Sequence, residues 1–130
     1  MADAAPALAG GDSAAGEELY TRCAACHALE RNRTGPKHCG LFGRRAGSVP
    51  GYAYSQAMKE SGIVWSARTL DRFLADPMAV VPGTSMGYAG IRDDAERAAL
   101  IAFLEFASHS PELCPAQSTR TPEYPEESGR

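Results

Sequence analysis

One stretch of five residues constrains the fold of this chain more than any other. Residues 23–27 read Cys-Ala-Ala-Cys-His, which is the C-x-x-C-H pattern of covalent haem attachment. Each cysteine thiol adds to one haem vinyl group, and the two residues between them let one helical turn span both vinyls. The histidine follows at once, so its imidazole can reach the iron from the same side. The pattern therefore predicts one haem c, attached through Cys23 and Cys26, with His27 as an iron ligand.

Two other readings of the paired cysteines compete with haem attachment. A thioredoxin-like C-x-x-C motif acts in redox exchange, but it requires a βαβ context that this sequence lacks. A zinc site requires two more ligands at short spacing, and His38 with Cys39 is the only nearby pair. Haem attachment is the interpretation that we favour.

Length and charge narrow the class of protein. The 130 residues suffice for one domain with one core. No apolar run approaches the ~20 residues that span a bilayer, and the net charge of −3 argues against nucleic-acid binding. The chain shows no secretory signal peptide. Ala7-Leu8-Ala9 resembles a signal-cleavage site, which predicts either a mature N-terminus behind an added Met1 or simply an Ala-rich end.

Apolar periodicity and capping residues predict four helices. The first runs from Asp12 or Ser13 to about Cys23, and the last opens at Asp93 with Glu96 three residues later. Two shorter helices are predicted between them, over residues 55–61 and from Ser66 to the Asp-Pro pair at 76–77. The apolar stripe of the last helix, residues 100, 103, 104 and 107, should pack on the face that carries Gly16 and Tyr20.

The rest of the chain shows no periodic pattern of apolar residues. Residues 28–50 are rich in glycine and proline, and residues 78–92 form an apolar stretch without a helical repeat. Such loops need a flat apolar object to lie on, and a haem face would serve. We expect residues 1–12 to form a mobile N-terminal segment, residues 13–114 a monohaem domain, and residues 115–130 a mobile tail rich in Pro, Glu and Ser.

Beyond the haem motif, five sequence blocks in order resemble the class I c-type cytochromes, of the mitochondrial cytochrome c and bacterial cytochrome c2 branch. They are Cys23-Ala-Ala-Cys-His27; Gly35-Pro36 with Gly40-Leu-Phe-Gly-Arg-Arg-Ala-Gly47; Pro50-Gly-Tyr-Ala-Tyr54; Gly62-Ile-Val-Trp65; and Pro82-Gly-Thr-Ser-Met86. The resemblance runs from about Gly16 to Ala107. It implies the all-α class I cytochrome c fold, in which helices and loops wrap one covalently bound haem.

The resemblance also implies the iron ligands and the residues around the haem. His27 would be the proximal ligand and Met86 the distal one; Met58 and Met78 are rival thioethers outside the Pro-Gly-Thr-Ser-Met block. The Pro36 carbonyl would accept a hydrogen bond from the free nitrogen of His27. The remaining cofactor-binding positions are Tyr54 and Trp65 as donors to a haem propionate, Arg44 to offset its charge, Thr84 near the distal propionate, Phe73 on the methionine side, and Tyr88 shielding the haem edge.

Three positions depart from the family pattern. The family usually has tyrosine at Phe73 and asparagine at Met58, so two of three polar groups on the methionine side are missing. We therefore predict a drier distal pocket. The family usually has leucine at His38. A buried imidazole without a partner is costly, so His38 has either a partner or an outward orientation.

Two cysteines remain after haem attachment, Cys39 and Cys114. Haem of this type is assembled in an oxidising compartment, and the resemblance places the end of the last helix beside the loop that carries Cys39. We expect a disulfide between them; the alternative is two free thiols.

Together these features predict a monomeric, soluble electron carrier in the bacterial periplasm rather than an enzyme. Its partners would be redox proteins: a bc1-type complex or a dehydrogenase as donor, and an oxidase or a photosynthetic reaction centre as acceptor. The alternatives are a peroxidase-like enzyme or a haem sensor in which Met86 dissociates. Mitochondrial members surround the haem edge with lysines. Here Arg22, Arg33 and Arg92 are interrupted by Met78, Ser85, Asp93 and Asp94, which predicts weak electrostatic steering.

Overall fold

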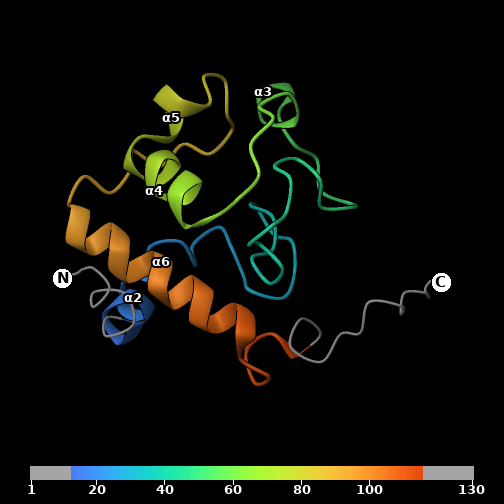
Figure 1. Ribbon diagram of the computed structural model, residues 1–130. Coiled ribbons are helices and arrows are strands. Elements are labelled where there is room, and N and C mark those ends of the chain that lie inside the picture. The colour runs from blue at the N-terminus through green and yellow to red at the C-terminus, as the bar shows by residue number, and fades with distance from the viewer. Residues whose placement is uncertain (1–12, 116–130) are drawn as a thin grey trace.

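The computed structural model describes residues 13–115, and their regular structure is helical (Figure 1). The helices are α2 (Ser13–Tyr20), α3 (Gln56–Lys59), α4 (Ala67–Ala75), α5 (Pro77–Val80) and α6 (Asp94–His109). Within this range the only extended pairing is one isolated bridge between Arg45 and Val64. The all-α fold class is therefore confirmed. The segments predicted to be mobile lie outside the described residues, except for Pro115.

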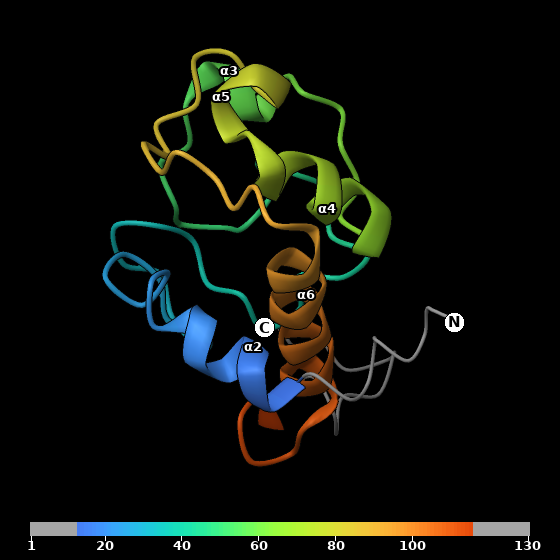
Figure 2. The ribbon, with the colours of Figure 1, turned by 90° about the vertical axis from the view of Figure 1, so that its left-hand side faces the viewer.

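Helices α2 and α6 cross in direct contact, as Figure 2 shows. The crossing depends on Gly16, because a Cβ atom at this position would lie 1.9 Å from the carbonyl oxygen of Ala99 and 2.7 Å from Cβ of Phe103. Glycine inside a helix costs about 1 kcal/mol relative to alanine. Here it lets the two backbones touch, and the predicted packing of α6 on the Gly16–Tyr20 face is confirmed.

Two helix boundaries differ from the prediction. The first helix ends at Tyr20, and residues 21–26 continue as hydrogen-bonded turns instead of reaching Cys23 as helix. Residues 77–80 form α5 where an irregular chain was predicted. The reason is local: the Asp76 side chain accepts a hydrogen bond from the N–H of Ala79, and Pro77 occupies the first turn, where its missing N–H costs nothing.

Capping and a buried arginine hold α4 and α6. Ser66 and Thr69 form a reciprocal capping box at the start of α4, and the Asp93 carboxylate accepts from the N–H of Glu96 at the start of α6. Arg97 of α6 is 8% exposed and donates to Asp71 of α4 at 2.8 Å. This charged hydrogen bond ties the two helices together on the side away from α2.

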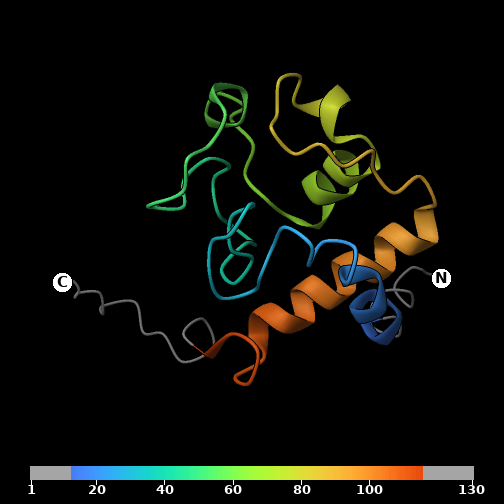
Figure 3. The same ribbon diagram turned by 180° about the vertical axis from the view of Figure 1, so that it is seen from behind.

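The long loop and the pair of helices α4 and α5 lie beside one another above α6. In Figure 3 the long loop between α2 and α3 lies on one side, α4 and α5 lie on the other, and α6 runs below both. No helix of residues 13–115 is long and apolar enough to cross a membrane.

The end of the described chain is joined to the first long loop. Cys39 and Cys114 form a disulfide, with a Cα–Cα distance of 5.6 Å. Both side chains are buried, at 6% and 1% exposure. The bond fixes residues 110–114, which follow α6, against the loop that begins after residue 27.

Candidate haem site

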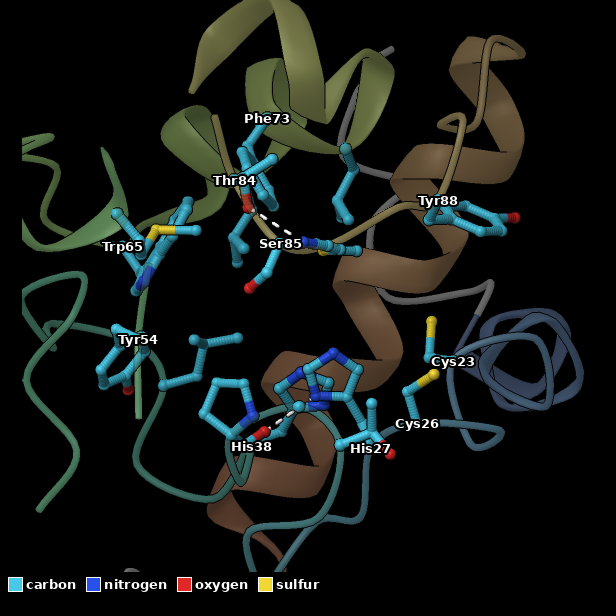
Figure 4. A pocket seen from close by; sticks show the side chains of 18 of the residues that line it. Cys23, Cys26, His27, His38, Tyr54, Trp65, Phe73, Thr84, Ser85 and Tyr88 are labelled. Atoms are coloured by element: carbon cyan, nitrogen blue, oxygen red, sulfur yellow. Dashed lines mark hydrogen bonds between the residues drawn. The ribbon is translucent and has the colours of Figure 1, made fainter. Parts of the chain in front are cut away.

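A cavity lies between the long loop, α4 and α6, and its walls come from most parts of the described chain. Its empty space is about 1280 Å³ when the open mouth is included. The lining is mainly apolar, with Leu41, Leu70, Leu100 and Leu104 among the residues of the wall. Figure 4 shows His27 and His38 on one side of the cavity and Thr84 and Ser85 on the opposite side. A flat apolar group with polar edges would fit between them.

The two cysteines of the C-x-x-C-H motif border this cavity as free thiols. The N–H groups of Cys26 and His27 both donate to the carbonyl of Cys23, at 3.0 and 2.8 Å, which closes one tight turn. Cys23 and Cys26 therefore lie on one edge of the cavity (Figure 4). Burial raises the pKa of the Cys23 thiol to about 11.

His27 has the arrangement of a metal-binding histidine. Its Nδ1 lies 2.8 Å from the Pro36 carbonyl and donates to it, while Nε2 has no hydrogen-bond partner within residues 13–115. The pKa of His27 lies below its usual value. Burial is the main cause, the hydrogen bond to Pro36 partly offsets it, and the positive charge of Arg33 lowers the pKa further. A neutral imidazole with a free Nε2 is the form that binds a metal.

Gly35 lies directly against the His27 ring. A Cβ atom on Gly35 would lie 2.2 Å from Cε1 and 2.5 Å from Nε2 of His27. Such distances are far shorter than van der Waals contact, so the imidazole can occupy this position only because residue 35 has no side chain.

Arg33 is a contributor that the sequence analysis placed only on the partner surface. Its guanidinium donates to the carbonyl of Ala24 at 2.6 Å and to the carbonyl of His27 at 3.1 Å. These bonds satisfy carbonyls of the attachment turn that have no helix to continue into. No sequence pattern signals the role, because the arginine reaches back across a loop of irregular conformation.

His38 has a partner, which settles the choice left open by the sequence. Its Nδ1 lies 2.8 Å from the Tyr20 hydroxyl. Its ring stacks on that of His27 with centroids 4.1 Å apart and an interplanar angle of 22°. Burial lowers the pKa of His38 well below its usual value, and the nearby His27 and Arg44 lower it further.

Tyr54 and Trp65 place polar groups on one wall of the cavity. The Tyr54 hydroxyl accepts from the N–H of Val49 at 3.1 Å, which leaves its own proton available. Trp65 is 7% exposed, and its indole N–H has no hydrogen-bond partner among residues 13–115. Both side chains border the cavity (Figure 4). A buried donor without an acceptor costs about 1–3 kcal/mol, so this wall is suited to an anionic group such as a carboxylate.

Arg44 borders the same wall. It donates to the carbonyls of Lys37 and Cys39, each at 2.8 Å, which uses two of its five N–H groups. Burial lowers the pKa of the guanidinium. A carboxylate at the wall would offset the cost of this half-buried charge.

The opposite side of the cavity is built mainly by packing. Thr84 accepts from the N–H of Met86 through its hydroxyl at 3.2 Å, and Phe73 packs edge-on against Trp65 with centroids 5.1 Å apart. Met58 and Met86 both border the cavity, whereas Met78 does not and is 54% exposed. Tyr88 borders the cavity near the cysteines (Figure 4).

Comparison with known proteins identifies the group that this cavity holds. The profile of the family Cytochrome c matches residues 13–108. The chain belongs to the cytochrome c family. A covalently bound c-type haem is therefore its cofactor. Three features of residues 13–115 suit it: the His27 Nε2 without a partner there suits an iron, the paired thiols suit two vinyl groups, and the Trp65 donor suits a propionate.

Individual relatives agree with this assignment. The chain is 41% identical to cytochrome c2 of Blastochloris viridis over 107 residues, which are 80% of this chain and 84% of the relative. It is 46% identical to cytochrome c of Cochliobolus lunatus over 99 residues, covering 73% and 92% of the two proteins. Among solved structures, cytochrome cH from Methylobacterium extorquens superimposes with a TM-score of 0.71 at 44% identity, covering 74% of this chain and 99% of that one.

Family membership resolves the competing readings of the paired cysteines. The cytochrome attaches haem, and it is a monohaem electron carrier. Cys39, which with His38 was the only nearby pair for a zinc site, is bonded to Cys114. Within residues 13–115, no cluster of three or more His, Cys, Asp or Glu side chains could hold a metal ion.

Proposed function

We propose that this cytochrome carries single electrons between redox protein complexes with His27 and Met86 as its axial iron ligands. The observation that carries the proposal is the position of His27: its Nδ1 is bound by Pro36, its Nε2 is free, and the loop with Thr84 and Ser85 lies across the cavity from it. A bound haem supplies a one-electron ferric/ferrous couple.

The side chains around the cavity support electron transfer by holding the two proposed ligands in place. His27 is fixed by Pro36 and Gly35, and the hydrogen bond from the N–H of Met86 to Thr84 orients the methionine loop. With His27 and Met86 both bound, the iron would have no position open to small molecules. A His/Met pair also raises the potential, because the soft thioether favours ferrous iron. Little has to move when the electron arrives or leaves.

The proposed partners are a bc1-type complex or a dehydrogenase as donor and an oxidase or a reaction centre as acceptor, in the bacterial periplasm, with the carrier acting as a monomer. The basic side chains of the haem edge are partly neutralised. Arg22 lies 3.9 Å from Glu96, and Arg92 lies 3.7 Å from Asp76. Exposed pairs of this kind contribute little stability, but they reduce the field available for steering. Association should therefore depend weakly on salt.

Replacement of Met86 by alanine tests the ligation. Haem should stay attached through Cys23 and Cys26, the potential should fall, and the ferric protein should lose the long-wavelength iron–sulfur charge-transfer band. Carbon monoxide should bind the ferrous variant and not the parent. Met58→Ala is the matched control, because Met58 borders the same cavity, and it should keep the band. An unchanged spectrum and potential in Met86→Ala would show that Met86 is not the ligand.

A further inference from the structure

A second imidazole, that of His38, lies on the His27 side of the cavity and has no part in the proposed ligation. His38 lies face to face with His27, with ring centroids 4.1 Å apart. Its Nδ1 is bonded to the Tyr20 hydroxyl at 2.8 Å. Three side chains from α2, from the haem-binding turn and from the loop after Pro36 therefore form one continuous chain of contacts.

The far end of this chain of contacts is held by the helix crossing. Tyr20 is the last residue of α2, is 9% exposed, and packs on Phe103 of α6 with ring centroids 5.4 Å apart. Because Gly16 brings the backbones of α2 and α6 together, the position of the Tyr20 hydroxyl is set by the helix pair.

His38 is held by its own backbone as well. Its N–H donates to the Leu29 carbonyl at 3.1 Å, and the next residue, Cys39, is fixed by the disulfide to Cys114. The ring therefore has little freedom to swing away from His27. Its orientation within this space is determined by the hydrogen bond at Nδ1.

Stacking against His38 restricts rotation of the His27 ring, a motion that the hydrogen bond to Pro36 does not fully restrict. That bond fixes which nitrogen of His27 carries the proton, and the neighbouring ring would limit rotation of an iron-bound imidazole. Ferric haem carries one more positive charge than ferrous haem. A polar imidazole beside the ligand stabilises that extra charge better than an aliphatic side chain would.

We propose that His38 is a positioning residue for the proximal ligand: oriented by the Tyr20 hydroxyl, it fixes the plane of His27 and lowers the reduction potential relative to leucine at the same position. This inference rests on the proposed ligation of iron by His27. The two can fail separately, because ligation is read from the absorption spectrum of the parent protein, whereas the effect of His38 is read from potentials of variants whose spectrum is unchanged.

The test uses the haem-loaded protein and the variants His38→Leu, Tyr20→Phe and the double variant. Redox titration gives the potential of each. Proton NMR of the ferric proteins gives the pattern of haem methyl shifts, which depends on the orientation of the axial imidazole plane. We expect His38→Leu to raise the potential and to change the methyl pattern while it keeps the iron–sulfur band. Tyr20→Phe should do the same to a smaller extent.

The double variant separates positioning from a general structural effect. If Tyr20 acts through His38, Tyr20→Phe should produce no further shift once His38 has been replaced by leucine. A potential that is unchanged in His38→Leu would overturn the inference. So would an equal effect of Tyr20→Phe in both backgrounds. If His38→Leu yields no haem-loaded protein, Tyr20→Phe alone decides, and an unchanged potential and methyl pattern would again overturn it.

Discussion

The two sides of the haem cavity are built in different ways. On the histidine side, the His27 ring donates a hydrogen bond to Pro36, and Arg33 donates to a carbonyl of the turn that carries the cysteines. The ring itself lies between Gly35 and His38. On the methionine side, one hydrogen bond joins Met86 to Thr84, and the Met86 and Met58 side chains pack against the apolar core. Directional bonds therefore fix His27, whereas Met86, the proposed second ligand, is held mainly by the shape of its pocket.

The largest expected effect comes from filling the contact between Gly35 and His27. In Gly35→Ala the new methyl group would overlap the imidazole, and the backbone of the loop would have to move. We expect the yield of haem-loaded protein to fall severely, and any loaded protein to lose its low-spin absorption spectrum.

Gly87→Ala is the matched control on the methionine side. A Cβ atom at Gly87 meets no other protein atom within 4 Å, and its backbone is outside the left-handed region. This variant should be loaded and have a normal spectrum. Equal loss of haem in both variants would contradict the difference between the two sides.

The second effect concerns the disulfide that supports the histidine side. Chain entropy for a separation of 75 residues corresponds to at most about 4.5 kcal/mol, and the attached haem already restricts the unfolded chain. We expect the variant with Cys39→Ser and Cys114→Ser to lose about 2 kcal/mol of unfolding free energy, measured by guanidinium titration of the haem-loaded protein. Alkylation of the denatured parent without reductant should add no label to either cysteine; two labels would show that the bond is absent in solution.

A third effect isolates the single hydrogen bond on the methionine side. Thr84→Val removes the acceptor of the Met86 N–H and should cost about 1 kcal/mol of methionine ligation. Imidazole competes with the methionine for ferric iron, so it should bind the variant about fivefold more tightly. Thr84→Ser retains the hydroxyl and should bind imidazole like the parent. If Thr84→Ser behaves like the valine variant, packing of the threonine methyl group is the more important contact.

The smallest effect is expected at Phe73, which is 4% exposed beside Trp65. Phe73→Tyr adds a hydroxyl on the methionine side, where Phe73 and Met58 are both apolar, and a better-solvated pocket favours ferric haem. The potential should fall slightly or hardly change. A clear rise in the redox titration would show that a new hydrogen bond to the methionine sulfur outweighs solvation of the charge.

Features that depend on neighbouring residues in the chain were predictable from the sequence. The start of α6 follows from Asp93 and Glu96, and the place of Gly16 in the helix crossing follows from one glycine on an otherwise ordinary helix. Helix α5 was missed because four residues are too few to show a period, and its cap comes from Asp76, which had been assigned only as a terminator.

Contacts between residues that lie far apart in the chain were harder to predict from the sequence. The motif located the cysteines and His27, but the bond between Tyr20 and His38 joins residues 18 positions apart through an irregular segment. The sequence predicted only that a buried His38 requires a partner. Likewise, nothing in the composition of residues 28–35 distinguishes an arginine that binds the attachment turn from one that faces solvent.

The burial of Cys39 and Cys114 also bears on the chemistry of the other two cysteines. A disulfide is broken when a thiolate attacks one of its sulfur atoms. In the folded chain both sulfurs belong to buried side chains, and burial keeps the pKa of Cys23 near 11, so this potential attacker is almost entirely a thiol at neutral pH. The fold thus gives the four cysteines two separate tasks: one pair forms a buried cross-link between the first loop and the end of the last helix, and the other pair borders the cavity, where it can bond to the vinyl groups of haem.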